Sequence, residues 1–513
     1  MKDTMAQDNS AAAVTTSDEP VDRTLSPPDT EALAHTNKSR WERLWPSLAC
    51  GAGLFSDGYL NGVIGQVNTM LSQIYGSKYS DSAAYSNVAS IVFAGTVVGM
   101  LIFGYTSDHY SRKWSLMAST IILIIFAALA AGAWGAHHSL GGMLAALTAY
   151  RFLLGIGIGG EYPAGSVACA ESSGELKAGT RNRWFILFTN VQIDFGFVIS
   201  AFVPLVLVWI CGEDHLRAAW RISLGLGVIP PMSLFYLRLK LQEPEAYKRE
   251  TMKRARTPWL LVIKYYWWRL FIVSAIWFIY DFSAYSFGIY SSKIVDIILG
   301  SSPPLWKSFG WTTVIYLFYM PGCILGSFVS DWIGPRATLA YGVLAQAIVG
   351  FIMAGCYNLL ATPSHVAGFV VVYGIFLSLG ELGPGDNIGL AASKTCATSV
   401  RGQYYAIAAA LGKVGAFVGT KVFPIIISNA PNEATGGQHA FWVSSSLCVF
   451  SAFLAFFCLP HIAQDTIVTE DIRFREYLLQ HGYDTSKMGV VELQAESVMN
   501  VDQAAEGEMT EKS

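Results

Sequence analysis

The chain has 513 residues, of which 53% are hydrophobic and only 14% are charged, and its mean hydropathy is +0.40. Ordinary soluble domains carry about a quarter of their residues as charged side chains, so this composition excludes a soluble globular protein and indicates a surface that faces lipid. The formal net charge of -3 gives no basic field for nucleic acid, and we expect no nucleic-acid partner.

The first 44 residues are predicted to form a disordered cytoplasmic tail. They are rich in Ser, Thr, Asp, Ala and Pro, and they lack the apolar core of a cleaved signal peptide. The first transmembrane helix is therefore expected to serve as the uncleaved insertion signal.

Apolar segments of about 20 residues, the length that crosses a bilayer, recur twelve times and predict an all-α integral membrane protein. They divide into a six-helix half over 45–241 and a second over 265–460, with a cytoplasmic loop over 242–264 and a cytoplasmic tail over 461–513. The predicted spans are 46–70, 87–106, 114–134, 142–169, 184–211, 220–241, 269–292, 309–331, 338–357, 366–391, 403–428 and 441–459.

Basic residues predict the orientation of these helices, because cytoplasmic loops of membrane proteins are enriched in Lys and Arg. Alternate loops and the stretch before the first helix are basic, whereas the opposite loops hold little beyond Lys78, Arg217 and Lys307. Both termini are therefore expected in the cytoplasm. The residues that carry this prediction are Arg40, Arg43, Arg112, Lys113, Lys177, Arg181, Arg183, Lys394 and Arg401.

The two halves repeat one short motif. Ser-Asp, two further residues, a small residue and then a base occur after helix 2, with Asp108 and Arg112, and again after helix 8, with Asp331 and Arg336. Such a turn can bridge neighbouring helices in one conformation and release them in another, and these four residues are predicted to gate the conformational change. Helix-end charges would explain a single copy, but two copies indicate a duplicated, rocking architecture.

No pattern for enzymatic chemistry stands out. The sequence has no P-loop for ATP, no cysteine and histidine spacing for a metal, and no Ser/His/Asp arrangement. We therefore expect no catalytic residue, no metal site and no cofactor, with the proton as coupling ion.

Ionisable side chains inside apolar helices are the informative residues, because a lone charge there costs at least about 2.5–3.5 kcal/mol and such groups are functional by default. One base stands among six acids, and this excess suggests that some acids are protonated, as proton coupling requires. The set is Asp57, Glu161, Asp194, Asp281, Glu381, Asp386 and Lys413.

Helix 4 carries a glycine-rich run that ends in Glu161, Tyr162 and Pro163. No strand precedes the run, so a dinucleotide-binding loop is not indicated. The glycines instead predict close packing of another helix. Pro163 disturbs the helix, which is expected to turn Glu161 and Tyr162 toward a cavity.

Helix 7 places Trp277, Asp281 and Tyr285 four residues apart, hence on one helix face. Aromatic stripes are usually packing, but a carboxylate between two aromatics offers hydrogen-bond donors and a titratable acceptor to a ligand.

Further polar residues lie in three other helices: Gln192 in helix 5, Asp386 and Asn387 in helix 10, and Lys413 in helix 11. Lys413 allows two interpretations, a buried structural ion pair with one acid or the anchor of an anionic substrate.

At these residues the chain resembles the phosphate:proton symporter branch of the major facilitator superfamily, and most closely the fungal glycerophosphodiester permeases. The helix 4 run GIGIGGEYP is similar to the branch signature, with Glu161 in place of the usual Asp. The helix 7 pattern W-x3-D-x3-Y and the glycine-lysine pair of helix 11 also match. The run after Gly383-Pro384-Gly385 and the C-terminal segment from Asp471 resemble the glycerophosphodiester permeases more than the phosphate symporters.

The resemblance implies the major facilitator fold and a set of site residues. It implies that Asp57, Glu161 and Asp281 carry protons. It implies that the substrate is bound by Tyr162, Gln192, Trp277, Asp281, Tyr285 and Lys413. Asp386 and Asn387 are added to the substrate site, with the alignment of the branch asparagine to Asn387 open by one residue.

The expected function is proton-coupled import of glycerophosphodiesters, carrying inositol or choline, across a fungal plasma membrane by alternating access. The partners expected are a small anionic phosphodiester, protons and membrane lipids, and the chain is expected to be a monomer. Two alternatives stay open at this point: a proton-coupled symporter of inorganic phosphate, and a non-transporting nutrient receptor on the same fold. In the C-terminal tail, Phe474, Tyr477 and Leu478 among charges predict a short amphipathic helix on the membrane or on the underside of the bundle.

Overall fold

The computed structural model describes residues 40–173, 176–177, 179–252, 255–300, 304–463, 466–486 and 488, and helices are the only regular secondary structure in these ranges. A chain that crosses a bilayer must satisfy its backbone hydrogen bonds within each segment, which a helix does. The predicted N-terminal tail falls outside the described residues up to position 39, but its last part is helical, because the first helix begins at Arg40.

Six crossings build the first half of the bundle, and four of them are made of two consecutive helices. In chain order they are α1 (Arg40–Gly51) with α2 (Leu54–Tyr75), α4 (Ala83–His109), α5 (Arg112–Ala131), α6 (Leu140–Gly160) with α7 (Val167–Ser173), α8 (Arg181–Phe188) with α9 (Asn190–Cys211), and α10 (Leu216–Gly225) with α11 (Ile229–Leu239).

Six crossings also build the second half. They are α13 (Trp259–Leu299), α14 (Leu305–Leu317) with α15 (Tyr319–Trp332), α16 (Pro335–Gly355), α18 (Val366–Gly380) with α19 (Asp386–Lys394), α20 (Arg401–Ser428) and α21 (Glu433–Phe457). Short helices outside the crossings are α3 (Ser77–Ser80), α12 (Glu245–Glu250), α17 (Tyr357–Leu360) and α22 (Thr466–Gln480).

The structure confirms the predicted twelve-helix architecture and corrects one boundary. Eleven of the described helices are long and apolar enough to cross a membrane. The twelfth, α2, is more polar because it is surrounded by other helices, and Asp57, Asn61 and Gln66 are all buried within it. Helix α13 begins at Trp259 instead of residue 269, because the aromatic residues of 259–268 extend it beyond the apolar core.

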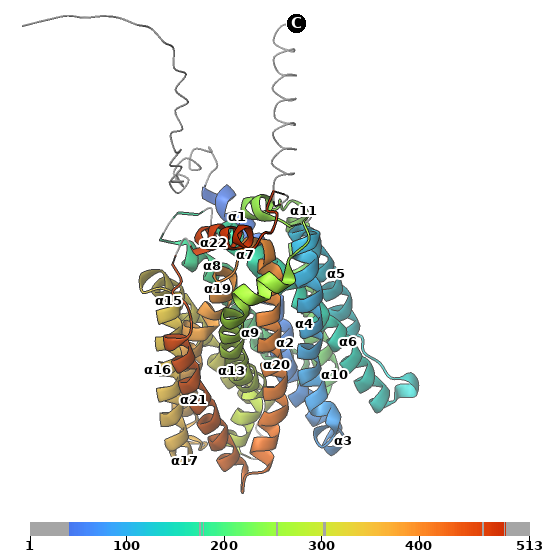
Figure 1. Cartoon of the computed structure of the whole chain (residues 1–513). Helices are drawn as coiled ribbons and strands as arrows, with labels where there is room; N and C mark the ends of the chain where they lie inside the picture. Colours follow the sequence, from blue (N-terminus) through green and yellow to red (C-terminus); the bar gives the residue numbers. More distant parts are fainter. Residues whose placement is uncertain are drawn as a thin grey trace, which may run out of the picture.

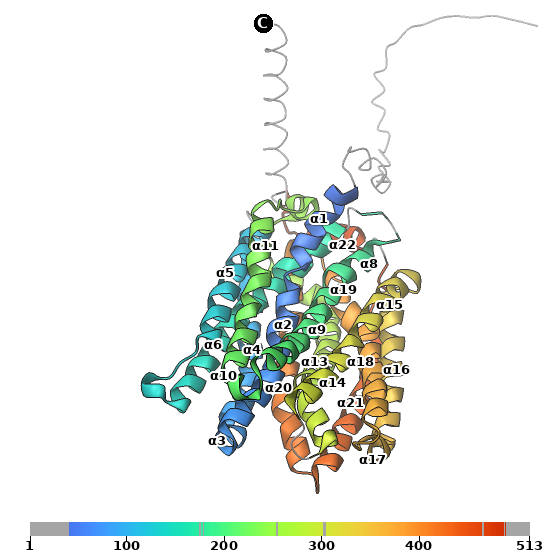
Figure 2. The same cartoon turned by 180° about the vertical axis from the view of Figure 1, so that it is seen from behind.

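The two halves lie side by side, with the first half in blue to green and most of the second half in yellow to red (Figures 1 and 2). Helices α1, α8, α11 and α22 lie at one end of the bundle, and α3 and α17 lie at the other (Figure 2). We name these ends the α22 face and the α3 face. Both ends of the described chain therefore lie on one side, as an even number of crossings requires.

Close approach of α4 and α6 explains the glycine run of helix 4. A Cβ atom added to Gly155 would lie 2.1 Å from the carbonyl oxygen of Val92, and one added to Gly159 would lie 2.3 Å from that of Thr96. Only glycine fits at these two positions, as the sequence predicted for helix packing in a membrane.

Helix α22 is the amphipathic helix predicted in the C-terminal tail, and it packs across the end of the bundle that is uppermost in Figure 1. Phe474 and Leu478 are buried against Tyr266 and Tyr404 of the second half. The carboxylate of Asp471 accepts hydrogen bonds from the backbone N–H and the hydroxyl of Thr398, at 2.5 and 2.7 Å.

Docking of α22 is expected to depend on pH through Asp471. Burial raises the pKa of this carboxyl to about 6, although Arg401 opposes the shift. A carboxyl with a higher pKa in the docked state takes up a proton on docking, so docking strengthens as pH falls and weakens as pH rises through about 6. Hydrogen exchange of α22, corrected for intrinsic rates, should show stronger protection at about pH 5 than at about pH 7.5. Asp471→Asn should remove this difference, and equal pH dependence in both proteins would contradict the assignment.

Candidate functional site

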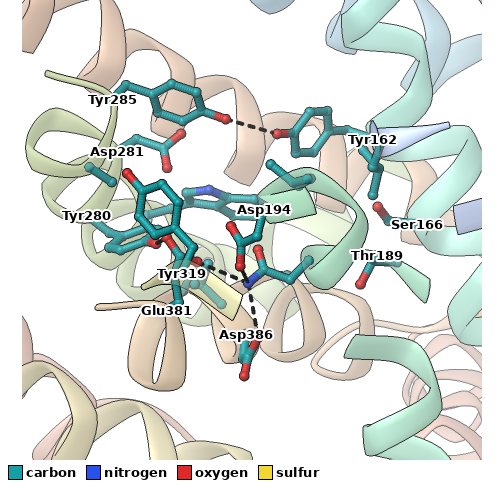
Figure 3. A pocket seen from close by; sticks show the side chains of 18 of the residues that line it. Tyr162, Ser166, Thr189, Asp194, Tyr280, Asp281, Tyr285, Tyr319, Glu381 and Asp386 are labelled. Atoms are coloured by element: carbon teal, nitrogen blue, oxygen red, sulfur yellow. Dashed lines mark hydrogen bonds between the residues drawn. The ribbon is translucent and has the colours of Figure 1, made fainter. Parts of the chain in front are cut away.

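A cavity of about 60 Å³ lies between the two halves (Figure 3), lined by described residues of α2, the turn between α6 and α7, α8 and α9 in the first half and of α13, α15, α19 and α20 in the second. A space of this size holds a few water molecules. Four acids, Asp194, Asp281, Glu381 and Asp386, and a single base, Lys413, line it. The cavity has two poles: Tyr162, Asp281 and Tyr285 lie at one end of the view in Figure 3, and the remaining acids gather at the other.

Lys413 organises the first pole. Its ammonium nitrogen lies 3.3 Å from Asp281 Oδ2 and donates a hydrogen bond to the hydroxyl of Tyr285. The nitrogen also lies 4.8 Å from the ring centroid of Tyr162, within the range of a cation–π contact. The lysine is 1% exposed, so these side chains are the protein groups that compensate its charge. We name Lys413 with these three residues the lysine pole.

Asp57 of α2 joins the lysine pole from outside the lining of the cavity. Its Oδ2 accepts hydrogen bonds from the hydroxyls of Tyr162 at 2.5 Å and of Tyr285 at 3.1 Å. Its Oδ1 accepts one from the amide of Asn61 at 2.5 Å. Asp281 therefore contacts the lysine directly, whereas Asp57 is linked to it through the two tyrosines, and the first half of the chain is hydrogen-bonded to the second here.

The second pole is built around the side-chain amide of Asn190. Its Nδ2 lies 3.4 Å from Asp194, 3.0 Å from Glu381 and 3.0 Å from Asp386, each time at a carboxylate oxygen. The hydroxyl of Tyr280 donates a further bond to Glu381 at 2.7 Å. We name these three acids with Asn190 and Tyr280 the acid pole. Charges of one sign at such distances repel strongly in a dry interior.

Breaks in helices 4 and 10 place Tyr162 at the lysine pole and Glu381 at the acid pole. Each crossing contains a π-helical turn, over Glu161–Ser166 and over Glu381–Gly385, and each turn begins with a glutamate and contains a proline. Proline removes a backbone donor, and π turns of this kind are frequent at functional sites. The predicted disturbance at Pro163 is therefore present, and its counterpart stands in the second half.

The structure brings together six of the eight predicted substrate residues. Asn387 is buried but bonds within its own region, accepting from the hydroxyl of Ser330 at 2.6 Å. Gln192 donates to the carbonyl of Leu187 at 3.2 Å. Neither of these two lines the cavity, and the roles predicted for all eight stay predictions. The six in the cavity are Tyr162, Trp277, Asp281, Tyr285, Asp386 and Lys413.

Glu161, predicted as a proton carrier, is held by an arginine and does not line the cavity. Its two oxygens accept from the guanidinium of Arg238 at 2.7 and 2.6 Å, and Ser119 donates to it at 3.0 Å. Both charged side chains are 1% exposed. A bidentate pair of this kind fixes the orientation of its carboxylate, so its geometry is that of a structural ion pair between α11 and helix 4.

Glu161→Gln is expected to destabilise the protein, because removing one partner of a buried ion pair costs about 3–5 kcal/mol. Thermal unfolding in detergent should show a clear loss of Tm. Replacing both partners, as Glu161→Gln with Arg238→Met, should recover most of it. Acid-stimulated uptake that survives in the double variant would exclude Glu161 as the proton carrier, whereas its loss at full stability would support the prediction from the sequence.

The predicted gate residues of the first half close the α22 face. Arg112 pairs with Asp108 at 2.5 Å and with Glu171 at 3.0 Å. Glu171 also pairs with Arg401 of the second half at 3.2 Å. Asp108 accepts from the backbone N–H of Gly402 at 3.0 Å, at the beginning of α20, where a helix N-terminus favours an anion. This network joins the two halves through buried charges.

The second copy of the motif makes an equivalent contact, from the second half to the first. Asp331 accepts from the backbone N–H of Arg183 at 3.3 Å, at the beginning of α8 in the first half. Arg336 donates to the carbonyl of Ala455, in α21, at 3.3 Å. Each half thus presents its aspartate to a helix N-terminus of the other half, and the gating role of the four residues stays a prediction.

The contacts that join the halves at the α3 face among the described residues are hydrogen bonds and not ion pairs. The hydroxyls of Thr69 and Ser292 lie 3.1 Å apart, and Lys421 donates to the hydroxyl of Ser86 at 3.1 Å. The cavity is therefore bridged on both sides, by ion pairs at the α22 face and by weaker polar contacts at the α3 face.

Sequence reasoning left several of these residues out of its site. Glu381 and Asp194 were recognised only as buried acids, and Asn190 and Tyr280 were not recognised. One sequence signal would have identified Glu381. The pair Gly380-Glu381 in helix 10 matches Gly160-Glu161 in helix 4, at the equivalent position of the other half. Glu171, Arg238 and Arg401 have no such signal, because their partners are distant in the sequence.

Comparisons with known proteins agree with this geometry. The family model for "Sugar (and other) transporter" matches residues 47–257 and 244–472. The proton:xylose symporter XylE superposes with a TM-score of 0.68 at 17% identity, covering 83% of this chain and 98% of that one, and at this identity the likeness shows the fold alone.

Three relatives from Candida albicans are each 52% identical to this chain. They are named glycerophosphodiester transporter GIT2, glycerophosphocholine permease GIT4 and major glycerophosphoinositol permease GIT3. The match to the first covers 90% of this chain and 87% of that protein. Each of the other two matches covers 87% of this chain and 84% of the relative. The chain is thus a multi-pass membrane protein that belongs to the sugar (and other) transporter family of the major facilitator superfamily, within its group of fungal glycerophosphodiester permeases.

Proposed function

We propose that this chain imports glycerophosphodiesters across a fungal plasma membrane together with protons, as a monomer, with the α22 face in the cytoplasm. One observation carries the proposal: Lys413 is the single base among the described residues of a cavity between two pseudo-symmetric halves. A phosphodiester is an anion that such a lysine can bind in an interior without water. The names of the three relatives support the same substrate class.

The lysine pole supplies a reason for proton coupling. Asp281 lies 3.3 Å from Lys413 and occupies the position that a substrate anion needs. When Asp281 takes a proton, its attraction to the lysine falls and the phosphodiester can replace it. An anion beside an ionised Asp281 would instead be repelled. Substrate and proton would therefore enter together, and Tyr162 and Tyr285 would donate hydrogen bonds to the phosphate oxygens.

Alternating access then follows from the two sets of bridges. The ion pairs around Glu171 would hold the α22 face closed while substrate enters from the α3 face, and they would separate to release substrate into the cytoplasm. Basic residues near the α22 face, including Arg112, Lys113 and Arg183, support its cytoplasmic orientation.

Uptake into yeast cells that lack their own carriers tests this function. Cells expressing the chain should accumulate labelled glycerophosphodiester faster at acidic than at neutral external pH, and excess inorganic phosphate should not compete. Complete competition by phosphate would favour the alternative of a phosphate symporter. Uptake indifferent to external pH and to a protonophore would contradict proton coupling.

A further inference from the structure

The acid pole carries more negative charge than its surroundings compensate. Asp194, Glu381 and Asp386 present six carboxylate oxygens, and the donors on them among the described residues are the amide of Asn190, the hydroxyl of Tyr280 and, on Asp194, the weakly donating thiol of Cys323. Asp386 is 1% exposed, lines the cavity, and its Oδ2 has no hydrogen-bond partner among the described residues. A buried carboxylate oxygen without a donor is costly, so this end of the cavity lacks a positive or donating group.

The side chains that line the described cavity do not supply that positive charge. Lys413 is the only base that lines the described cavity, and it belongs to the lysine pole, where Asp281 and Asp57 already face it. The described residues hold no group of three His, Cys, Asp or Glu suited to a metal ion. The charge that would balance the acid pole must therefore arrive with a ligand or as protons.

Aromatic rings surround the acid pole as well as acids. Tyr280 and Tyr319 line the cavity and are drawn beside Glu381 in Figure 3, whereas the ring of Trp277 lies nearer the lysine pole, 6.4 Å from that of Tyr162. Carboxylates together with aromatic faces are the chemistry that recognises an organic cation, and quaternary ammonium groups in particular. A neutral polyol would instead require neutral donors and acceptors, which this end offers mainly through Asn190.

The geometry points to a cationic head-group subsite at the acid pole, so that the cavity binds a zwitterionic phosphodiester, its phosphate on Lys413 and its ammonium between Asp194, Glu381, Asp386 and the aromatic rings. This inference rests on the proposed function, and it names the substrate as a glycerophosphodiester of choline or ethanolamine. Tyr280 and Asp281 are consecutive in α13 and belong to different poles, so one short molecule can reach both.

Charge also distinguishes this substrate from an anionic one. The lining residues carry four acids against one base. A glycerophosphodiester with a neutral head adds a further negative charge to this surplus, whereas one with an ammonium head adds none. The relatives named for choline and for inositol are equally similar to this chain, so the cavity provides a distinction that overall identity does not.

The test compares two diesters of one shape. Glycerophosphocholine and the glycerophosphodiester of 3,3-dimethylbutanol differ in that a quaternary carbon replaces the nitrogen, which removes the charge. At subsaturating concentration, wild-type protein should take up the choline ester about tenfold faster, the scale of a desolvated cation–π and charge contact. This wild-type comparison requires no variant to fold.

Variants then locate the effect. Asp386→Asn and Glu381→Gln should each bring the ratio of the two uptake rates, choline ester over dimethylbutanol ester, closer to one. Tyr162→Phe, the matched change at the lysine pole, should slow both esters and leave their ratio unchanged. Equal uptake of the two esters by wild-type protein would overturn the subsite, as would an unchanged ratio in both acid variants. Uptake of neither ester would contradict the proposed function itself, and the subsite with it.

Discussion

Replacing Lys413 by alanine is expected to reduce glycerophosphodiester uptake at least about 100-fold, while the protein still reaches the membrane. A charge pair at 4 Å and an effective dielectric constant of 20 is worth about 4 kcal/mol, and the variant loses this attraction for the phosphate. Asp281 loses its partner too, but a buried acid can become neutral by binding a proton. Initial uptake rates, normalised to the amount of protein at the cell surface, measure the effect.

Two controls give this result its meaning. Lys413→Arg keeps the positive charge and should retain part of the uptake. Lys264→Ala removes an exposed lysine of α13 and should transport like the wild type. Retained transport by Lys413→Ala with an unchanged KM would mean that the lysine is a structural partner of Asp281, the other interpretation that its sequence position allows.

Glu171→Gln is expected to open the α22 face. Glu171 is the carboxylate shared by Arg112 and Arg401, and all three side chains are at most 1% exposed. Removing one partner from a buried ion network costs about 3–5 kcal/mol, so the balance between closed and open states should move by at least about 100-fold. Transport should fall strongly, because the cycle requires this face to close.

Native cysteines report this opening directly. Cys396 is buried beside Arg401, whose guanidinium donates to its carbonyl oxygen at 3.1 Å, whereas Cys356 is exposed. A thiol-reactive reagent followed by mass spectrometry should show faster modification of Cys396 in Glu171→Gln, with Cys356 as the internal standard. Glu213→Gln, the matched loss of a carboxylate charge at the α3 face, where Glu213 accepts from the backbone N–H of Leu305, should leave Cys396 protected. Equal protection of Cys396 in wild type and Glu171→Gln would contradict the gate.

The sequence predicted most of the fold because apolar length and basic loops are local properties. It also predicted that Trp277, Asp281 and Tyr285 share a face, and all three line the cavity. Helical spacing alone determines such a face. The beginning of α13 was predicted ten residues late, at 269 instead of 259, because aromatic residues extend a helix past the apolar core that hydropathy detects.

The site was predicted less completely because its contacts join distant segments. Nothing near Glu161 in the sequence shows that Arg238, at the end of helix 6, binds it. Gln192 is two residues from both Asn190 and Asp194, about half a turn of α9, so its side chain points away from the cavity face on which those two residues lie. Packing between helices decides such rotations, and spacing within one helix does not reveal them.

The two equivalent glutamates illustrate how the halves diverged. Glu161 and Glu381 open matching π-helical turns, but the first half supplies Arg238 as a partner, whereas the second supplies Asn190 and Tyr280. An acid compensated by arginine becomes structural, while one without a base remains available to a ligand or a proton. The repeat thus provides the scaffold, and the departures from its symmetry provide the site.

The most direct measurement uses purified protein reconstituted in liposomes with an imposed pH gradient. With the outside acidic, labelled glycerophosphocholine should accumulate above its external concentration, and the pH of the lumen should fall as it enters. A protonophore should abolish both changes. Accumulation that ignores the gradient, or proton movement without substrate entry, would contradict proton-coupled transport of glycerophosphodiesters by this chain.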